Sequence, residues 1–195
     1  MIQPLGVILA GGQATRMGGG DKGLLPLGRS TILGSVIARL EPQVAGLALN
    51  ANGDASRFDA LKLPVSSDSV HGFAGPLSGV LAGLDWAVTQ GATHIVTAAA
   101  DTPFFPCDLV PQLILAAETA GTQIALAATP DGRHPTFGLW PVALRDDLRT
   151  DLENGLRKVV LWTDKHGCAV AEFPNDAAFF NVNTPDDLAK AEAML

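Results

Sequence analysis

A glycine-rich segment near the start of the chain holds the residues with the clearest chemical potential. It runs from Leu9 to Lys22, follows a short apolar run and contains two cations, Arg16 and Lys22. Glycines allow the backbone to approach an anion closely and to turn its N–H groups towards it. The segment therefore predicts a loop that binds phosphate. The alternative is a surface loop without a ligand.

Two commoner phosphate-binding patterns do not fit this loop. Lys22 stands between Asp21 and Gly23, whereas the Walker A pattern has Ser or Thr after its lysine. Gly18, Gly20 and Gly23 match G-x-G-x-x-G literally. They lie well beyond the apolar run, however, and the dinucleotide fingerprint belongs at the turn that directly follows a strand.

A carboxylate follows a second apolar run. Asp101 comes after the segment His94 to Ala98 and two further alanines, and Pro103 follows it closely. An aspartate just beyond a strand is well placed to hold Mg²⁺ against phosphate oxygens. A turn capped by the same aspartate is equally consistent with the sequence.

Amides and another carboxylate occupy similar positions. Asn50 follows the apolar run Val44 to Leu49, and Asp68 comes soon after the next one. Such groups can bind a base edge or ribose hydroxyls. For Asn52, which precedes a glycine, ordinary turn chemistry is the better interpretation.

Asn181 and Asn183 flank Val182 near the end of the chain. An extended backbone would place both amides on one face. A helix cap is the alternative, and Thr184 is expected to be one because Pro185 and two aspartates follow it.

Composition limits the class of protein. The chain has 195 residues, 47% of them hydrophobic, and a formal net charge of −7, which argues against general nucleic-acid binding. It has two cysteines, Cys107 and Cys168, without the spacing of a zinc site, so neither a disulfide framework nor a cysteine metal site is expected. The apolar run at the start is too short to span a membrane. We expect a cytoplasmic monomer with a single domain over residues 1–195.

Apolar patterns then predict the elements that position these groups. The expected strands are Leu5–Leu9, Val44–Leu49, Leu63–Ser66, His94–Ala98, Ile124–Ala128, Thr136–Trp140 and Cys168–Phe173. The expected helices run from the cap at Ser30 or Thr31 to Leu40, from Asp54 to Leu61, Leu77 to Thr89, the cap at Asp108 to Ala120, Val142 to Glu153, Leu156 to Lys165, and onwards from Thr184. This alternation predicts an α/β three-layer sandwich, in which a mostly parallel twisted sheet has helices on both faces. Ligands bind such Rossmann-like sheets beyond the carboxyl ends of the strands.

Together these motifs resemble one family. The first motif spans residues 9–22 and consists of LAGG, three variable residues, RMGG, one variable residue and DK. It is followed by NAN at 50–52, GPLSG at 75–79, DTP at 101–103 and NVNTP at 181–185. The set is similar to the molybdenum cofactor guanylyltransferases of the MobA family, and the resemblance covers nearly the whole chain.

The resemblance implies a role for each matching residue. Leu9, Ala10 and Gly11 would contact the guanine nucleotide through their backbone, and Gly12 would lie close by. Lys22 would bind the triphosphate, and Arg16 matches the arginine of the signature loop. Asn50 and Asp68 would contact the nucleoside, Asp101 would contact the phosphates and Mg²⁺, and Asn181 and Asn183 would border the site.

The implied reaction transfers GMP from GTP to the terminal phosphate of molybdenum-molybdopterin and releases pyrophosphate, with Arg16, Lys22 and Asp101 as catalytic residues. Gly12 favours the guanylyl enzymes, since cytidylyl relatives resemble LAAG instead. His134-Pro135 resembles a segment on the pterin side, and molybdoenzymes or their chaperones are candidate partners. Two alternatives stay open: a cytidylyl- or other small-molecule nucleotidyltransferase, and a non-catalytic module that binds and delivers nucleotide or cofactor.

Overall fold

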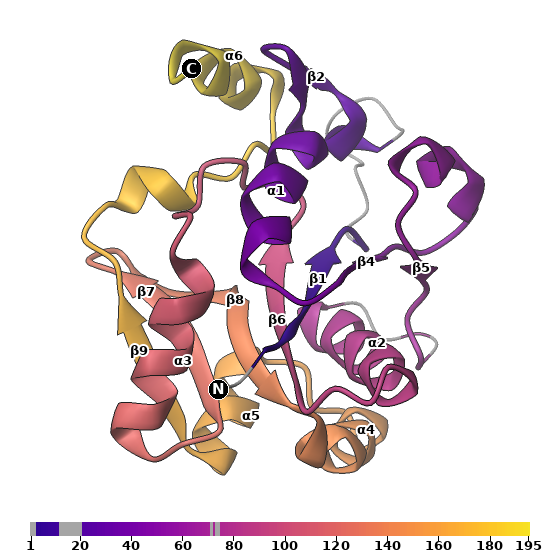
Figure 1. Cartoon of the computed structure of the whole chain (residues 1–195), viewed down its shortest axis with the longest axis vertical. Helices are drawn as coiled ribbons and strands as arrows, with labels where there is room; N and C mark the ends of the chain where they lie inside the picture. The colour runs from indigo at the N-terminus through magenta and orange to yellow at the C-terminus, as the bar shows by residue number, and fades with distance from the viewer. Residues whose placement is uncertain (1–2, 12–20, 71, 73–74) are drawn as a thin grey trace.

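The computed structural model describes residues 3–11, 21–70, 72 and 75–195. Within these residues, seven strands form a central sheet in the order β5-β4-β1-β6-β8-β7-β9. Helices lie on both sides of this sheet (Figure 1). The predicted three-layer α/β architecture is confirmed.

The elements have the following bounds. The strands are β1 Leu5–Leu9, β2 Pro26–Leu27, β3 Ser30–Thr31, β4 Leu47–Asn50, β5 Val65–Ser66, β6 His94–Ala99, β7 Ile124–Thr129, β8 Gly132–Pro141 and β9 Cys168–Glu172. The α-helices are α1 Ile32–Leu40, α2 Pro76–Thr89, α3 Leu109–Ala120, α4 Arg145–Glu153, α5 Val159–His166 and α6 Pro185–Ala193. The 3-10 helices are η1 Lys22–Leu24, η2 Glu41–Gln43, η3 Ala55–Leu61, η4 Val142–Leu144 and η5 Asp176–Phe179.

The core lies on both faces of the sheet, which explains why β1 is apolar at successive positions. Ile8 packs in one cluster with α1 and α3. Val7, its neighbour, packs in the other with α2, α4 and α5. Alternate side chains of a strand point to opposite faces, so a strand covered on both sides must be apolar throughout.

The central strands end at one edge of the sheet. β1 runs parallel to both β4 and β6, with Leu9 opposite Asn50 on one side and Ala99 on the other. The segments after Leu9, Asn50 and Ala99 therefore leave the sheet side by side. β8 is antiparallel to its neighbours β6 and β7, so the sheet is mostly rather than wholly parallel.

Some local predictions were wrong. Asp108 occupies the N-cap position of α3 as predicted, but its carboxylate makes no capping hydrogen bond and instead accepts one from Gln112 Nε2 at 3.2 Å. The helix predicted from Val142 begins there as η4 and continues as α4 from Arg145, whereas α5 starts at Val159 and β4 at Leu47, both later than predicted. The hairpin of β2 and β3 has no counterpart in the predicted elements, because two-residue strands carry too little pattern.

Helix α6 and the β2–β3 hairpin share a small apolar cluster of Leu27, Ile32, Val182 and Ala191. Thr184 caps α6 in a reciprocal capping box with Asp187, as its sequence signature predicts. Figure 1 shows α6 beside β2 at the same end of the molecule. The last helix therefore holds the chain that follows Lys22 against the segment that contains Asn183.

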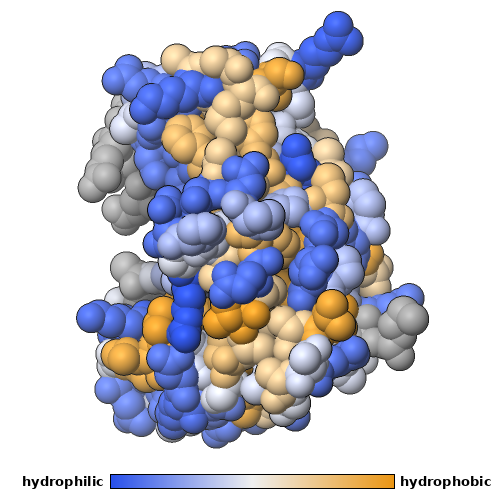
Figure 2. Space-filling view, turned by 90° about the vertical axis from the view of Figure 1, so that its left-hand side faces the viewer, coloured by the Kyte–Doolittle hydropathy of each residue, from blue (hydrophilic) through white to orange (hydrophobic). Residues whose placement is uncertain are grey.

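The molecular surface mixes residue types. On the face shown in Figure 2, apolar residues lie among hydrophilic ones. Among the described residues, the exposed large hydrophobic side chains are dispersed over several elements: Val88, Leu115, Leu161, Met194 and Leu195. None of the helices that the structure describes is long and apolar enough to cross a membrane.

Candidate active site

A cavity of about 920 Å³ opens at the carboxyl ends of β1, β4 and β6. Eight of the residues predicted for the site line it: Leu9, Ala10, Gly11, Lys22, Asn50, Asp68, Asp101 and Asn181. The sequence separates these residues by up to 172 positions, and the parallel strands bring them to one edge. Gly12 and Arg16 lie outside the described residues, so their predicted roles stay predictions.

A charged centre forms one side of the cavity. Lys22, the first residue of η1, places Nζ 2.6 Å from Asp101 Oδ2 and 2.7 Å from Asn183 Oδ1. Asp101 and Lys22 each keep 22% of their side chain exposed, so the pair is partly open to solvent. An ammonium group held by a carboxylate and an amide, facing a cavity, is suited to bind a phosphate.

The late asparagines reach this centre from the far end of the chain. Val182 is buried and donates its backbone N–H to the Asp101 carbonyl at 2.8 Å, which fixes the segment. Asn181 Oδ1 then accepts a hydrogen bond from Thr102 Oγ1 at 2.5 Å. Asn181 therefore contacts the residue that follows Asp101, and Asn183 contacts Lys22, the partner of Asp101.

A second polar cluster lies where β4 ends. Asn50 is 2% exposed, and its Nδ2 donates to Asp68 Oδ1 at 3.0 Å and to the Ser66 carbonyl at 3.2 Å. Asn52 Nδ2 donates to Asp68 Oδ2 at 2.9 Å, while Asn52 Oδ1 accepts from the Asp68 backbone N–H at 2.9 Å. Asn52 is therefore more than a turn residue, contrary to the interpretation of its sequence. The carboxylate of Asp68 is held through both oxygens.

Glycines let the backbone come close to this cluster. A Cβ at Gly11 would lie 3.4 Å from both Asn50 Oδ1 and Asn52 Nδ2. A Cβ at Gly79, in the first turns of α2, would lie 2.4 Å from Asn50 Oδ1. The Ala10 N–H donates to the Asn50 carbonyl at 2.8 Å, so this amide is already used inside the sheet.

Arg57 is a component of the site that the sequence interpretation missed. Its Nε pairs with Asp21, the residue before Lys22, and its Nη2 donates to the Asn52 carbonyl at 2.6 Å. The guanidinium also lies over the Phe58 ring, 4.6 Å from the centroid. Arg57 thus links the two walls of the cavity. No local pattern marks Arg57 in the sequence, because its partner Asp21 is 36 positions away.

His134 lies near the same end of the sheet, at the start of β8. Its ring stacks on Phe179 at 4.3 Å between centroids, and its Nε2 lies 2.9 Å from Thr129 Oγ1. Burial lowers the pKa of His134, and the nearby Asp176 and Asp131 oppose this shift. Phe179 is close in sequence to Asn181, so this stack supports the approach of the late asparagine segment.

Comparison with known proteins decides the family. The family model described as "MobA-like NTP transferase domain" matches residues 6–167. The chain belongs to this family.

Curated relatives agree. A protein named molybdenum cofactor guanylyltransferase from Mesorhizobium japonicum is 49% identical, covering 97% of this chain and 95% of its own. One of the same name from Cereibacter sphaeroides is 52% identical, covering 97% and 96%. The structure of molybdopterin-guanine dinucleotide biosynthesis protein A from Archaeoglobus fulgidus matches with a TM-score of 0.74, 24% identity and 97% coverage of both chains. The resemblance inferred from the motifs is confirmed.

The donor set at Asp101 is compatible with a hard divalent cation. Within the described residues, no group of three or more His, Cys, Asp or Glu side chains could enclose a metal. Mg²⁺ seldom needs such a group, because it is commonly held by one or two carboxylates together with substrate phosphates and water. Asp101 supplies one carboxylate at the cavity, and membership of a nucleotidyltransferase family indicates divalent metal use.

Proposed function

We propose that this protein transfers GMP from GTP to the terminal phosphate of molybdenum-molybdopterin, forming the guanine dinucleotide cofactor and pyrophosphate. The observation that carries the proposal is the pairing of the Lys22–Asp101 centre with the Asn50–Asp68 cluster in one cavity. The curated relatives that share about half of their residues with this chain carry the corresponding name.

In this proposal the two sides of the cavity divide the nucleotide between them. Asp68 and Asn50 bind the nucleoside, close to the backbone of Leu9, Ala10 and Gly11. Lys22 binds the triphosphate and, together with Arg16, offsets the charge that grows on the leaving pyrophosphate. Asn181 and Asn183 border the reacting phosphates; Asn181 holds Thr102 in place and Asn183 holds Lys22.

Asp101 would hold Mg²⁺ on the phosphates. When bound, the cation would supply charge neutralisation at the phosphates. In the structure Lys22 Nζ is bound to the Asp101 carboxylate. An ammonium group has three N–H donors, and Asp101 and Asn183 accept two of them, so the third can bind phosphate.

The acceptor explains why the site needs no strong base. A phosphate monoester has a second pKa of about 6, so most of it is dianionic at neutral pH and can attack directly. The protein has to position the two phosphates in line and exclude other geometries. The site residues named above serve these purposes, and none of them has to abstract a proton.

The remaining parts of the proposal concern context. We propose a single domain over residues 1–195, a cytoplasmic location, a monomeric state, and delivery of the product to molybdoenzymes or their chaperones. Dispersal of exposed large hydrophobic side chains over different elements supports the monomer. Gly12 favours GTP over CTP.

Thermal unfolding with a panel of nucleotides tests the proposal. GTP should raise the unfolding temperature with Mg²⁺ present, and CTP, UTP and ATP should raise it much less, because only a bound ligand stabilises the folded state. Preference for CTP would favour a cytidylyltransferase. Nucleotide binding without pyrophosphate release in the presence of a verified acceptor would favour a delivery module.

A further inference from the structure

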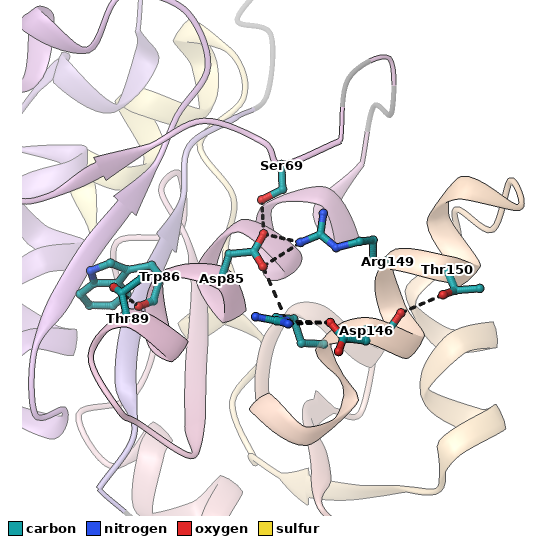
Figure 3. Close-up of polar contacts among 8 residues, drawn as sticks. Ser69, Asp85, Trp86, Thr89, Asp146, Arg149 and Thr150 are labelled. Atoms are coloured by element: carbon teal, nitrogen blue, oxygen red, sulfur yellow. Dashed lines mark hydrogen bonds and ion pairs between the residues drawn. The ribbon is translucent and has the colours of Figure 1, made fainter.

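An ionic cluster on the outer side of α2 contacts the loop that carries Asp68. Asp85 of α2 accepts a hydrogen bond from Ser69 Oγ at 2.5 Å. Arg149 Nη2 of α4 donates to both oxygens of the same carboxylate at 2.8 Å. Figure 3 shows Ser69 pointing from its loop towards Asp85, and Arg149 approaching the carboxylate from α4.

Stability alone is a weak explanation for this cluster. The side chains of Asp85 and Arg149 are 29% and 34% exposed. Ion pairs at such partly exposed positions contribute little to folding stability, about 0–1 kcal/mol. Two arginines, Arg149 and the more distant Arg145 at 3.8 Å, nevertheless surround one carboxylate. Their geometric effect is to fix the orientation in which Asp85 meets Ser69.

Ser69 directly follows the residue that needs positioning. On one side of the loop, Asn50 and Asn52 hold the Asp68 carboxylate and backbone N–H. On the other side, Ser69 ties the adjacent residue to α2. Val70 then packs against the apolar cluster beneath α2. Asp68 is therefore fixed between two anchors, and the Asp85 cluster supplies the polar anchor on the helix side.

We propose that Ser69 and Asp85 are positioning residues for the nucleoside-binding carboxylate of Asp68, with Arg149 orienting Asp85. Neither Ser69 nor Asp85 lines the cavity, so both act through Asp68. The inference rests on the proposed function, since it assigns the nucleoside to Asp68. Without the Ser69 anchor, the Asp68 segment samples other orientations, and the fraction competent to bind nucleotide falls.

The test uses the full chain and two readouts. Ser69→Ala removes only the anchor and leaves the Asp85–Arg149 pair between α2 and α4 in place. We expect its dissociation constant for GTP to rise about tenfold, the size of one lost hydrogen bond to a charged group, and its unfolding temperature to fall by only a few degrees, about 2–4 °C. Ser69→Thr keeps the hydroxyl and should restore binding. Hydrogen exchange at the Asp68 amide, measured without nucleotide, should be faster in Ser69→Ala only.

Asp146→Asn is the matched control. Asp146 pairs with Arg145 in the same cluster but does not contact Ser69, and its side chain is 79% exposed. It should change neither readout. If hydrogen exchange at the Asp68 amide is the same in Ser69→Ala as in the parent, the positioning role is overturned. This outcome does not depend on which nucleotide the protein binds. Parent protein that fails to bind GTP, together with faster exchange in the variant, would contradict the proposed function and leave the positioning of Asp68 supported.

Discussion

Replacing Gly79 with alanine should damage nucleotide binding more than folding. The new Cβ would meet Asn50 Oδ1 at 2.4 Å, Leu9 Cδ2 at 2.8 Å and Asn50 Cγ at 3.1 Å. The Asn50 amide cannot easily retreat, because it is buried and its Nδ2 is bound to both Ser66 and Asp68. Restoring ordinary contact requires the Asn50 side chain to move by about 1 Å. In a site that positions reacting groups, a misplacement of this size can lower the reaction rate by about 100-fold.

The stability effect should be smaller because two contributions oppose each other. Overpacking in a core costs about 1–3 kcal/mol. Alanine is favoured over glycine within a helix by about 1 kcal/mol, which offsets part of that cost. We therefore expect Gly79→Ala to lose about 0–2 kcal/mol of unfolding free energy. Its dissociation constant for GTP should rise by about 10- to 100-fold, the size of one or two hydrogen bonds lost from the displaced Asn50–Asp68 cluster.

Gly83→Ala is the control on the same helix. Its Cβ would meet Val7 Cγ2 at 2.8 Å and Ile95 Cδ1 at 2.9 Å, in the core and away from the polar cluster. It should lower the unfolding temperature and leave GTP affinity unchanged. Calorimetric titration with GTP and denaturant unfolding of both variants make the comparison. A folded Gly79→Ala protein that binds GTP as tightly as the parent would refute the role given to Asn50.

Three other predictions concern chemistry, packing and pH. Asp101→Asn should cut pyrophosphate release by about 100-fold or more while leaving far-UV circular dichroism unchanged, and near-normal turnover would remove Asp101 from the mechanism. Trp140→Phe should lower unfolding free energy by about 1–3 kcal/mol, because it leaves the buried Thr97 hydroxyl without the Trp140 Nε1 donor at 2.9 Å; equal denaturation midpoints would contradict this. Burial lowers the pKa of His134 in the folded protein below its ordinary value of 6.5. The unfolded chain therefore protonates this histidine more readily, and the free energy of unfolding decreases as the pH falls below 6.5. His134→Gln should flatten this decline in pH-dependent denaturation, and an unaltered slope would exclude the histidine as its source.

The sequence was most informative where burial dictates residue type. β1 matches its predicted bounds because a strand covered on both faces must be apolar at every position. The cap at Thr184 was also predictable, since its hydroxyl and the Asp187 side chain satisfy local backbone groups. Asp101 and Asn50 could be selected because strand ends meet at one edge of a parallel sheet.

The sequence was least informative about contacts that depend on tertiary geometry. Nothing in the local pattern indicates that Asn52 holds Asp68, since the same Asn-Gly pair is typical of turns. Arg57 was missed because its partner Asp21 lies 36 positions away and only the fold brings the two together. The antiparallel direction of β8 is likewise set by its connection to β7, which periodicity does not reveal.

Formation of the dinucleotide product tests the central claim most directly. The protein is mixed with Mg²⁺, molybdenum-molybdopterin and either GTP or CTP, and the products are identified by mass spectrometry alongside measured pyrophosphate. Our account predicts the guanine dinucleotide and one pyrophosphate per product with GTP, and little product with CTP. Active protein that makes only the cytosine dinucleotide, or that binds GTP and acceptor without releasing pyrophosphate, would contradict it.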